Sequence, residues 1–367
     1  MNFLVVPDSF KGSMTGEEFC AIARKVLCQN ENNLVASCPI ADGGEGSVEC
    51  LMNAIDGVLV GGKAADGNLF KKNATYGVKD DSAYIAIANT SGLPQTLIKN
   101  PLYTSTYGMG EQIKQALNLG KKNIYLFLGG SSTNDCGAGM LAALGCKFFD
   151  ENGEQFIPVG GTLGKIASID DAEMRKSIEG VRFTALCDVK NPLLGKNGCS
   201  YVFAPQKGAK GDDLSTLEEN MRLFYEKTKY LRVDQNFDGA GAAGGTGYCI
   251  KAFLGGNIVS GIDYFLDACG FDEAAKDADF IISGEGKFDR TSLNGKAVGG
   301  IVARARKLGK EVVVFCGVSD IEGELPCGVK SIYRINDASL SVEENMKATK
   351  NNFEKAISKF LREVENA

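Results

Sequence analysis

One local pattern occurs repeatedly in this chain and narrows the folds that it can adopt. In each case a short apolar run, rich in β-branched or aromatic residues, is followed by a polar loop and then by residues with helical spacing. The apolar runs are residues 3–7, 34–38, 123–128 and 279–283. Such runs are typical of buried strands, and strands that alternate with helices form parallel sheets. The pattern predicts an α/β fold whose loops lie beyond the carboxyl ends of the strands, where ligands bind in open α/β sheets.

The pattern is interrupted between residues 57 and 88. This part alternates short strand-like runs around an Asp66-Gly67 turn signal, which is typical of an antiparallel ribbon. We therefore predict two domains, the second inserted into the first. Residues 1–60 plus 285–367 would form a discontinuous α/β domain with an open parallel sheet flanked by helices, and residues 61–284 an inserted α/β domain that contains the ribbon.

Two helix starts carry a clear signature. Thr15 with Glu18, and Ser341 with Glu344, have the spacing of a capping box, and each pair precedes residues with helical periodicity. We expect a helix to begin directly after Thr15 and a long helix after Ser341.

The composition excludes several classes of function. The chain has no histidine, which removes histidine-based triads and histidine-ligated zinc, and leaves Asp, Glu, Lys, Tyr or Cys to move protons. Its net charge of −6 argues against nucleic-acid binding. No apolar stretch is long enough to cross a bilayer, so we expect a cytoplasmic protein. The 12 cysteines include no CxxC pair and mostly lie in apolar runs, which predicts reduced, buried thiols.

Glycine, acids and lysine gather in the loops that follow the apolar runs. Glycine lets backbone N–H groups approach an anion, carboxylates hold Mg²⁺, and lysine neutralises phosphate. Any single Asp in such a place could be a helix cap, but this combination is typical of phosphoryl transfer. The residues concerned are Asp8, Asp42, Glu45, Asp135, Asp188, Glu285 and Asp289, with Lys11, Lys207, Lys287 and Lys296.

Six motifs, in this order and spacing, resemble the type I glycerate kinase family. They are VVPDSFKGSMTGEE, PIADGGEGS, GGSSTNDCGAGMLAALG, CDVKNPLLGKNGCSYVFAPQKGA, GAGAAGGTGY and ISGEGKFDRTSLNGKAVGG, and the resemblance extends to about residue 318. It implies ATP-dependent, Mg²⁺-dependent phosphorylation of D-glycerate at the 2-hydroxyl, in a cleft between two α/β domains.

The resemblance also implies site residues, to which we give expected roles. Asp188, Asp42 and Lys11 are the catalytic candidates, with Asp188 as the base and Asp42 as its rival. The expected substrate-binding residues are Asp8, Ser9, Lys11, Asp42, Glu45, Asn134, Asp135 and Asp289. The expected nucleotide-binding residues are Gly129, Gly130, Ser131, Thr133, Lys207, Gly284, Glu285 and Gly286. Metal binding is expected from Asp8, Asp289 and Glu285.

The chain departs from the family pattern at a few positions. A glutamate usual in the family is replaced by Ala86, which puts any role of that carboxylate in doubt. The smaller departures are at Ser132, Cys136, Asp238, Thr291 and Ser292. Two alternatives stay open: a kinase for another small hydroxy acid, and a non-catalytic protein that binds a sugar acid or nucleotide. In either case we expect small-molecule partners and a monomer or homodimer.

Overall fold

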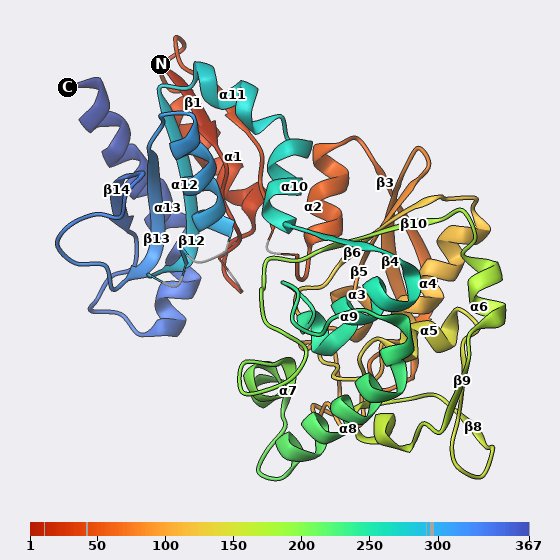
Figure 1. The fold of residues 1–367 in the computed structure, drawn as a ribbon. Helices are drawn as coiled ribbons and strands as arrows, with labels where there is room; N and C mark the ends of the chain where they lie inside the picture. The colour runs from red at the N-terminus through yellow and green to blue at the C-terminus, as the bar shows by residue number, and fades with distance from the viewer. Residues whose placement is uncertain (11, 42, 291, 294–296, 367) are drawn as a thin grey trace. The chain divides into compact units, whose positions relative to one another are not determined.

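In the computed structural model, which describes residues 1–10, 12–41, 43–290, 292–293 and 297–366, the chain divides into two units (Figure 1). Unit 1 consists of Met1–Asp42 and Ile262–Ala367, and unit 2 of Gly43–Gly261. The α/β class is confirmed. The boundaries between the units lie at 42/43 and 261/262. Both come earlier in the chain than the 60/61 and 284/285 boundaries expected from the sequence. The first crossing is early because α2 (Ser47–Ala54) packs on the strands of unit 2.

Unit 1 is built around a five-stranded sheet. All of its strands are parallel, in the order β14-β13-β12-β1-β2. Their bounds are β1 Asn2–Val5, β2 Leu34–Ser37, β12 Phe280–Phe288, β13 Val312–Ser319 and β14 Val329–Arg334. The helices are α1 Gly16–Leu27, α10 Gly261–Ala268, α11 Phe271–Asp277, α12 Ala297–Lys307 and α13 Val342–Glu365.

Aromatic packing holds α1 and α13 against one face of this sheet. Phe3 and Phe315 point into a buried cluster with Phe19 of α1 and Phe353 of α13, and the rings of Phe19 and Phe353 stack 3.9 Å apart. Successive strand residues point to opposite faces, so buried Val312 and Val314 face the other side, where α12 contacts β12 and β13. Unit 1 is therefore a sheet between two layers of helices.

Both predicted capping boxes are confirmed. Thr15 Oγ1 accepts a hydrogen bond from Glu18 N at 3.2 Å, and Glu18 Oε2 accepts one from Thr15 N at 3.0 Å. Ser341 and Glu344 exchange the same pair of bonds at the start of α13. Among the described residues, no helix offers an apolar stretch that could span a membrane.

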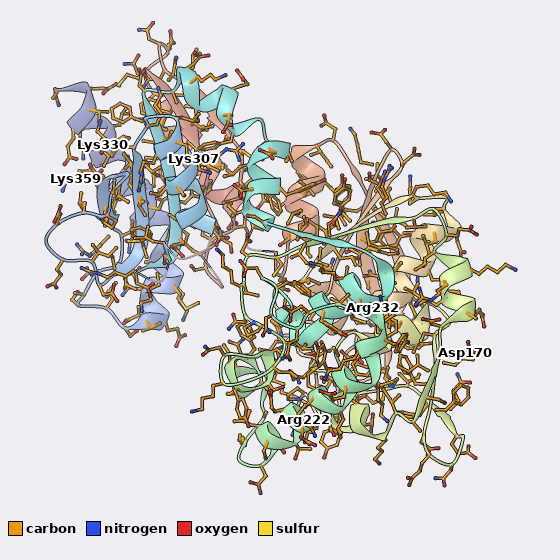
Figure 2. The ribbon with its side chains drawn as sticks, in the orientation of Figure 1. Asp170, Arg222, Arg232, Lys307, Lys330 and Lys359 are labelled. Carbon is orange, nitrogen blue, oxygen red and sulfur yellow. A yellow bond between two sulfur atoms is a disulfide. The ribbon has the colours of Figure 1, made fainter. Side chains whose placement is uncertain are left out.

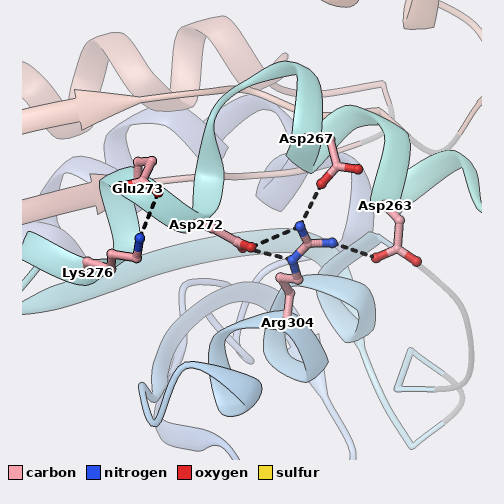
Figure 3. A network of polar contacts seen from close by, with 6 residues as sticks. All are labelled: Asp263, Asp267, Asp272, Glu273, Lys276 and Arg304. Atoms are coloured by element: carbon pink, nitrogen blue, oxygen red, sulfur yellow. Dashed lines mark hydrogen bonds and ion pairs between the residues drawn. The ribbon is translucent and has the colours of Figure 1, made fainter.

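A guanidinium on α12 ties this helix to the preceding two. Arg304 Nε donates to Asp272 Oδ1 at 2.7 Å, and its terminal nitrogens reach Asp267 at 2.6 Å and Asp263 at 3.4 Å (Figure 3). The Arg304 hydrogen bonds lower the pKa of Asp272. The network links α10, α11 and α12, which are consecutive helices around β12.

The cysteines differ from expectation at one pair. Cys38 and Cys269 form a disulfide within unit 1, with Cα atoms 6.1 Å apart and a sequence separation of 231 residues. The expectation of reduced thiols is therefore wrong for this pair, because nothing local in the sequence indicates the contact. Most of the other cysteines are free and buried.

Unit 2 has a six-stranded mixed sheet in the order β11-β10-β6-β5-β4-β3. Strands β5 (Ser82–Ala86), β6 (Asn123–Phe127), β10 (Arg182–Leu186) and β11 (Asn257–Val259) are parallel. Strands β3 (Val58–Ala65) and β4 (Lys71–Lys79) form the expected antiparallel ribbon around the Asp66 turn. A small second sheet contains β7 Lys147–Phe149, β8 Gln155–Phe156 and β9 Ser168–Asp170.

The helices of unit 2 enclose the larger sheet and its core. After α2 come α3 Ala88–Ser91, α4 Tyr107–Asn118, α5 Ala138–Ala143, α6 Ala172–Ser177, α7 Cys199–Phe203, α8 Asp213–Thr228 and α9 Ala242–Leu254, with 3₁₀ helices at Gly160–Lys165, Pro205–Lys207 and Lys229–Leu231. Many charged side chains lie on the surface of the two units. All six labelled in Figure 2 are exposed: Asp170, Arg222, Arg232, Lys307, Lys330 and Lys359.

Candidate functional site

The strand order of unit 1 identifies one place on its sheet where a ligand is expected. The order corresponds to 2-1-3-4-5 along the chain, so the sheet winds in opposite directions from β1 and from its neighbour β12. Open α/β sheets bind ligands beyond the carboxyl ends of the two strands that meet at such a reversal. The residues that follow β1 and end β12 therefore form the candidate site of unit 1.

Asp8 and Glu285 lie together at this reversal. Asp8 N donates to Gly284 O at 2.9 Å, which extends the pairing of β1 with β12 and aligns Asp8 beside Glu285. Both residues are largely buried, at 7% and 8% exposure. Ser9 follows, and its backbone N–H donates to Asp8 Oδ1 at 2.7 Å.

The segment containing Gly284, Glu285 and Gly286 is strand rather than the loop expected from the sequence. The strand β12 continues to Phe288 because β13 pairs with it that far, with Glu285 opposite Cys316. A Cβ on Gly284 would lie 2.6 Å from Phe315 O, so the close approach of these strands requires glycine there.

Asp289 follows at the end of β12. Its Oδ1 accepts from Ser292 N at 3.0 Å, and its Oδ2 pairs with Lys287 Nζ at 3.0 Å. The predicted residues Lys11 and Asp42, and Lys296 with them, lie outside the described residues. Within the described ranges, no three acidic or cysteine side chains are grouped closely enough to hold a metal ion. The carboxylates of Asp8, Glu285 and Asp289 still suit Mg²⁺, which commonly takes only one or two protein carboxylates and completes its shell with water and substrate phosphates.

In unit 2, the parallel strands of the larger sheet bring several predicted residues to one edge. Leu128, Gly129 and Gly130 follow β6, and Asp188 follows β10. The glycine pair of the PIADGGEG motif packs on this edge too: Gly129 N donates to Gly43 O at 3.1 Å, and a Cβ on Gly129 would lie 2.6 Å from the Gly43 carbonyl carbon. Glycine at 129 is thus needed for the contact that joins the two Gly-rich loops.

A buried lysine lies beside the loop that follows β6. Lys207 is 3% exposed, and its Nζ donates to Ser131 Oγ at 2.9 Å and to Thr133 O at 2.7 Å. In the part of the chain that the structure describes, it makes no ion pair, and burial lowers its pKa to about 8 although Cys199 and Asp135 raise it. An ammonium that is desolvated without a carboxylate partner is a candidate for anion binding.

Two further polar atoms of this loop are buried without a hydrogen bond among the described residues: Thr133 Oγ1 and Asn134 Oδ1. The other end of the Asn134 amide donates to Ser200 Oγ at 3.3 Å. Such orphaned atoms are uncommon in proteins and often mark a site for water, an ion or a ligand.

Asp135 has a different environment from the other predicted acids. It is fully buried, and its Oδ2 accepts from Thr106 N at 2.7 Å, Thr106 Oγ1 at 2.8 Å and Gly139 N at 3.2 Å. Burial raises its pKa, whereas these hydrogen bonds lower it. Its carboxylate connects the start of α5 to the start of α4 inside the protein.

Asp188 is half-buried and oriented by a hydroxyl. Ser260 Oγ donates to Asp188 Oδ1 at 2.9 Å, and a Cβ on Gly261 would lie 2.9 Å from Asp188 Oδ2. Asp188 follows β10 and Ser260 follows the neighbouring strand β11, so adjacent strands supply the carboxylate and the group that positions it.

Unit 2 also contains a cavity of about 650 Å³ next to the joined glycine loops. Of the predicted residues, it is lined by Glu45. Sequence reasoning missed the rest of its lining, which includes Lys72, Asn89 and Gln95. Lysine or asparagine on a strand or short helix is usually solvated, so only the fold identifies these side chains as part of one cavity wall.

Ala86, where the family pattern has glutamate, ends β5 and is fully buried. The antiparallel pairing of β4 with β5 extends to Gly77 opposite Tyr84, and Thr75, two residues before Gly77 on β4, lines the cavity. Thr75 Oγ1 donates to Glu49 Oε1 at 3.2 Å. A carboxylate from α2 therefore lies beside β4, the strand that pairs with the strand of Ala86.

Comparisons with known proteins agree over almost the whole chain. A family model described as the glycerate kinase family matches residues 3–365. The glycerate kinase of Bacillus cereus (strain ATCC 10987) is 38% identical over 363 residues, covering 96% of this chain and 95% of that protein. The glycerate 2-kinase of Escherichia coli K12 is 38% identical over 328 residues, covering 86% of this chain and 85% of that protein.

A solved structure is also similar. A crystal structure from Salmonella typhimurium LT2, assigned as a glycerate kinase 2, aligns with a TM-score of 0.85 at 32% sequence identity. The alignment covers 100% of this chain and 98% of that one.

Proposed function

The chain belongs to the glycerate kinase family, a family of phosphotransferases with an alcohol group as acceptor, and we propose that it transfers the γ-phosphoryl group of ATP to the 2-hydroxyl of D-glycerate. The products would be 2-phosphoglycerate and ADP. The observation that carries this proposal is the ammonium of Lys207, which is buried beside the Gly129–Gly130 loop without an ion-pair partner among the described residues.

Lys207 supports the proposal because phosphoryl transfer depends mainly on positioning and on neutralising charge. Glycine at the exposed position 130 lets phosphate oxygens approach the backbone of this loop, and the Lys207 ammonium supplies a positive charge at the adjoining Ser131. A desolvated charge acts more strongly on a phosphate than one in water. The lysine and the loop would together bind the phosphoryl group as it transfers.

Asp188 is the base in this proposal. Its carboxylate accepts the proton of the 2-hydroxyl as that oxygen bonds to the γ-phosphorus, while the bond to the β-phosphate oxygen breaks and ADP leaves with the electron pair. The hydroxyl of Ser260 holds the Asp188 carboxylate in one orientation. Because the chain has no histidine, a carboxylate is the natural group for this step.

One or two of the carboxylates of Asp8, Glu285 and Asp289 would hold Mg²⁺ in the same proposal, with water and substrate phosphates as the other ligands. When bound, Mg²⁺ neutralises the β- and γ-phosphates of ATP. Asp8 and Glu285 lie at the strand reversal of unit 1, and Asp289 lies just beyond the end of β12.

The test is ADP release in a coupled assay with MgATP and a panel of acceptors. We expect turnover with D-glycerate and far less with L-glycerate, lactate or tartronate. Faster turnover with another acid would identify a kinase for that acid. Binding of D-glycerate without ADP release would indicate a non-catalytic binding protein.

A further inference from the structure

The cavity next to the glycine loops contains a cation that the proposed reaction has not used. Lys72 of β4 lines the wall, and its Nζ donates to the side-chain oxygen of Gln95. No ion pair of Lys72 exists among the described residues. Burial lowers the pKa of Lys72, while Asp66 and Glu45 raise it. A partly desolvated ammonium whose direct partner is a neutral amide can gain a hydrogen bond and an ion pair from an anionic ligand.

The cavity is fixed to the candidate phosphate loop at two points. On one side, Glu45 follows the glycine pair whose carbonyl accepts from Gly129 N. On the other, Leu93 N donates to Gly130 O at 2.9 Å, shortly before Gln95. A small molecule in this cavity would therefore lie next to the loop that we expect to bind the transferred phosphoryl group.

The remaining polar groups suit hydroxyls. Asn89 Nδ2 donates to Thr75 O at 3.0 Å, which orients the amide and leaves its oxygen as an acceptor. Glu49 Oε2 is buried and has no hydrogen bond among the described residues, although Oε1 accepts from Thr75. The wall thus combines the ammonium of Lys72, with Lys63 as a second lysine in the lining, with several acceptors, which is the complement of a carboxylate that carries neighbouring hydroxyls.

We propose that this cavity is the acceptor subsite and that Lys72 binds the carboxylate of the hydroxy acid, with Asn89 and Glu45 near its hydroxyls. The proposal rests on the proposed function for the identity of the acid. A cavity of about 650 Å³ has the size of ordinary small-molecule pockets and exceeds a three-carbon acid, so shape alone would discriminate poorly. A charged partner supplies selectivity that shape does not, because substrates without the carboxylate leave the ammonium unpaired.

The test is equilibrium dialysis of radiolabelled D-glycerate without nucleotide, combined with steady-state kinetics. We expect Lys72→Met to weaken D-glycerate binding and raise its KM about ten- to hundredfold, the range for one charge-assisted hydrogen bond. The KM for MgATP should not change, and Lys72→Arg should restore part of the affinity. Lys71→Met is the matched control, because Lys71 lies next on the strand, does not line the cavity and pairs with Glu111.

A second variant tests the cavity by filling it. A Cβ on Gly61 would have no atom within 4 Å, and Gly61 does not have positive φ, so Gly61→Leu can fold and place its side chain in the cavity. We expect it to weaken D-glycerate binding as well, with an unchanged circular dichroism spectrum.

The outcomes separate this inference from the proposed function. Wild-type affinity for D-glycerate in both Lys72→Met and Gly61→Leu, or no binding of D-glycerate by the wild type, overturns the inference. Lys72-dependent binding without ADP release supports the inference and overturns the proposed kinase activity. If turnover with D-glycerate is the same in Lys72→Met as in the wild type, the kinase activity is supported and the acceptor subsite does not lie in this cavity.

Discussion

Lys207 Nζ lies 2.9 Å from Ser131 Oγ, inside a protein interior that offers this ammonium no carboxylate among the described residues. Burial lowers the pKa of Lys207 to about 8 from the usual 10.5. Between these values the unfolded chain retains a proton that the folded protein has released, so stability rises with pH in this window. Below pH 8 the folded protein carries the full cost of the buried charge.

This pH dependence can be measured by comparing the stability of the wild type with that of Lys207→Met. The free energy of unfolding of the wild type, relative to this variant, should increase by about 1.4 kcal/mol per pH unit between pH 8 and 10. Urea denaturation at pH 7, 8, 9 and 10 measures it. The exposed Lys210→Met should show no such trend, and a pH-independent difference for Lys207→Met would mean that burial does not lower the pKa of Lys207 in the folded protein.

Replacing Asp188 separates catalysis from folding. Asp188→Asn keeps the size of the side chain and its contact with Ser260 but removes the basic carboxylate. We expect the turnover number to fall about 10²–10⁴-fold, with little change in melting temperature. Asp81→Asn, an exposed substitution in the same unit, is the control. Turnover within a factor of a few of the wild type would exclude Asp188 as the base.

Removing a carboxylate at the strand reversal should change the requirement for metal. Glu285→Gln is expected to raise the Mg²⁺ concentration for half-maximal activity about tenfold or more, since Mg²⁺ binds through few protein carboxylates. EDTA should abolish turnover of the wild type, and added Mg²⁺ should restore it. The exposed Glu324→Gln should titrate like the wild type. An unchanged Mg²⁺ titration for Glu285→Gln would show that this side chain does not hold the metal.

The Arg304 network predicts a stability effect that depends on salt and acid. Exposed ion pairs contribute about 0.2–1 kcal/mol each, so Arg304→Met should lower the free energy of unfolding by about 1 kcal/mol at pH 7 and low salt. Arg304 lowers the pKa of Asp272 in the folded protein, so this contribution is present above the usual Asp pKa and is lost as the pH falls through the lowered value.

The measurement is chemical denaturation of Arg304→Met at pH 7 and pH 3, with and without 1 M salt. Arg306→Met on the same helix is the control, because Arg306 is exposed and makes no ion pair among the described residues. An effect of Arg304→Met that is equal under all these conditions would attribute it to packing rather than charge.

Local features of the fold could be predicted from the sequence. The capping boxes at Thr15 and Ser341 and the Asp66 turn depend on neighbouring residues, and each was found where expected. The strand order could not be predicted, because it depends on contacts between residues far apart in the sequence. For example, Ser283 Oγ of β12 donates to Val6 O, 277 residues away in the sequence. The disulfide of Cys38 could not be predicted for a similar reason, because its partner Cys269 lies 231 residues away in the sequence.

The site was predictable to a similar extent. The positions of Asp8, Asp188 and Gly129 beyond strand ends follow from the strand-loop-helix pattern. The burial of Asp135 does not follow from it, because Thr106 and Gly139 surround its carboxylate through packing between α4 and α5. Lys72 was missed since a lysine on a strand gives no local signal, and only the folded ribbon makes it part of a cavity.

The most direct test of the proposed reaction is phosphorus NMR of the products formed from MgATP and D-glycerate by the purified protein. We predict resonances of 2-phosphoglycerate and ADP in equal amounts. The 3-phospho isomer would contradict the assignment of the 2-hydroxyl, and ATP that persists unchanged beside D-glycerate would contradict the proposed reaction as a whole.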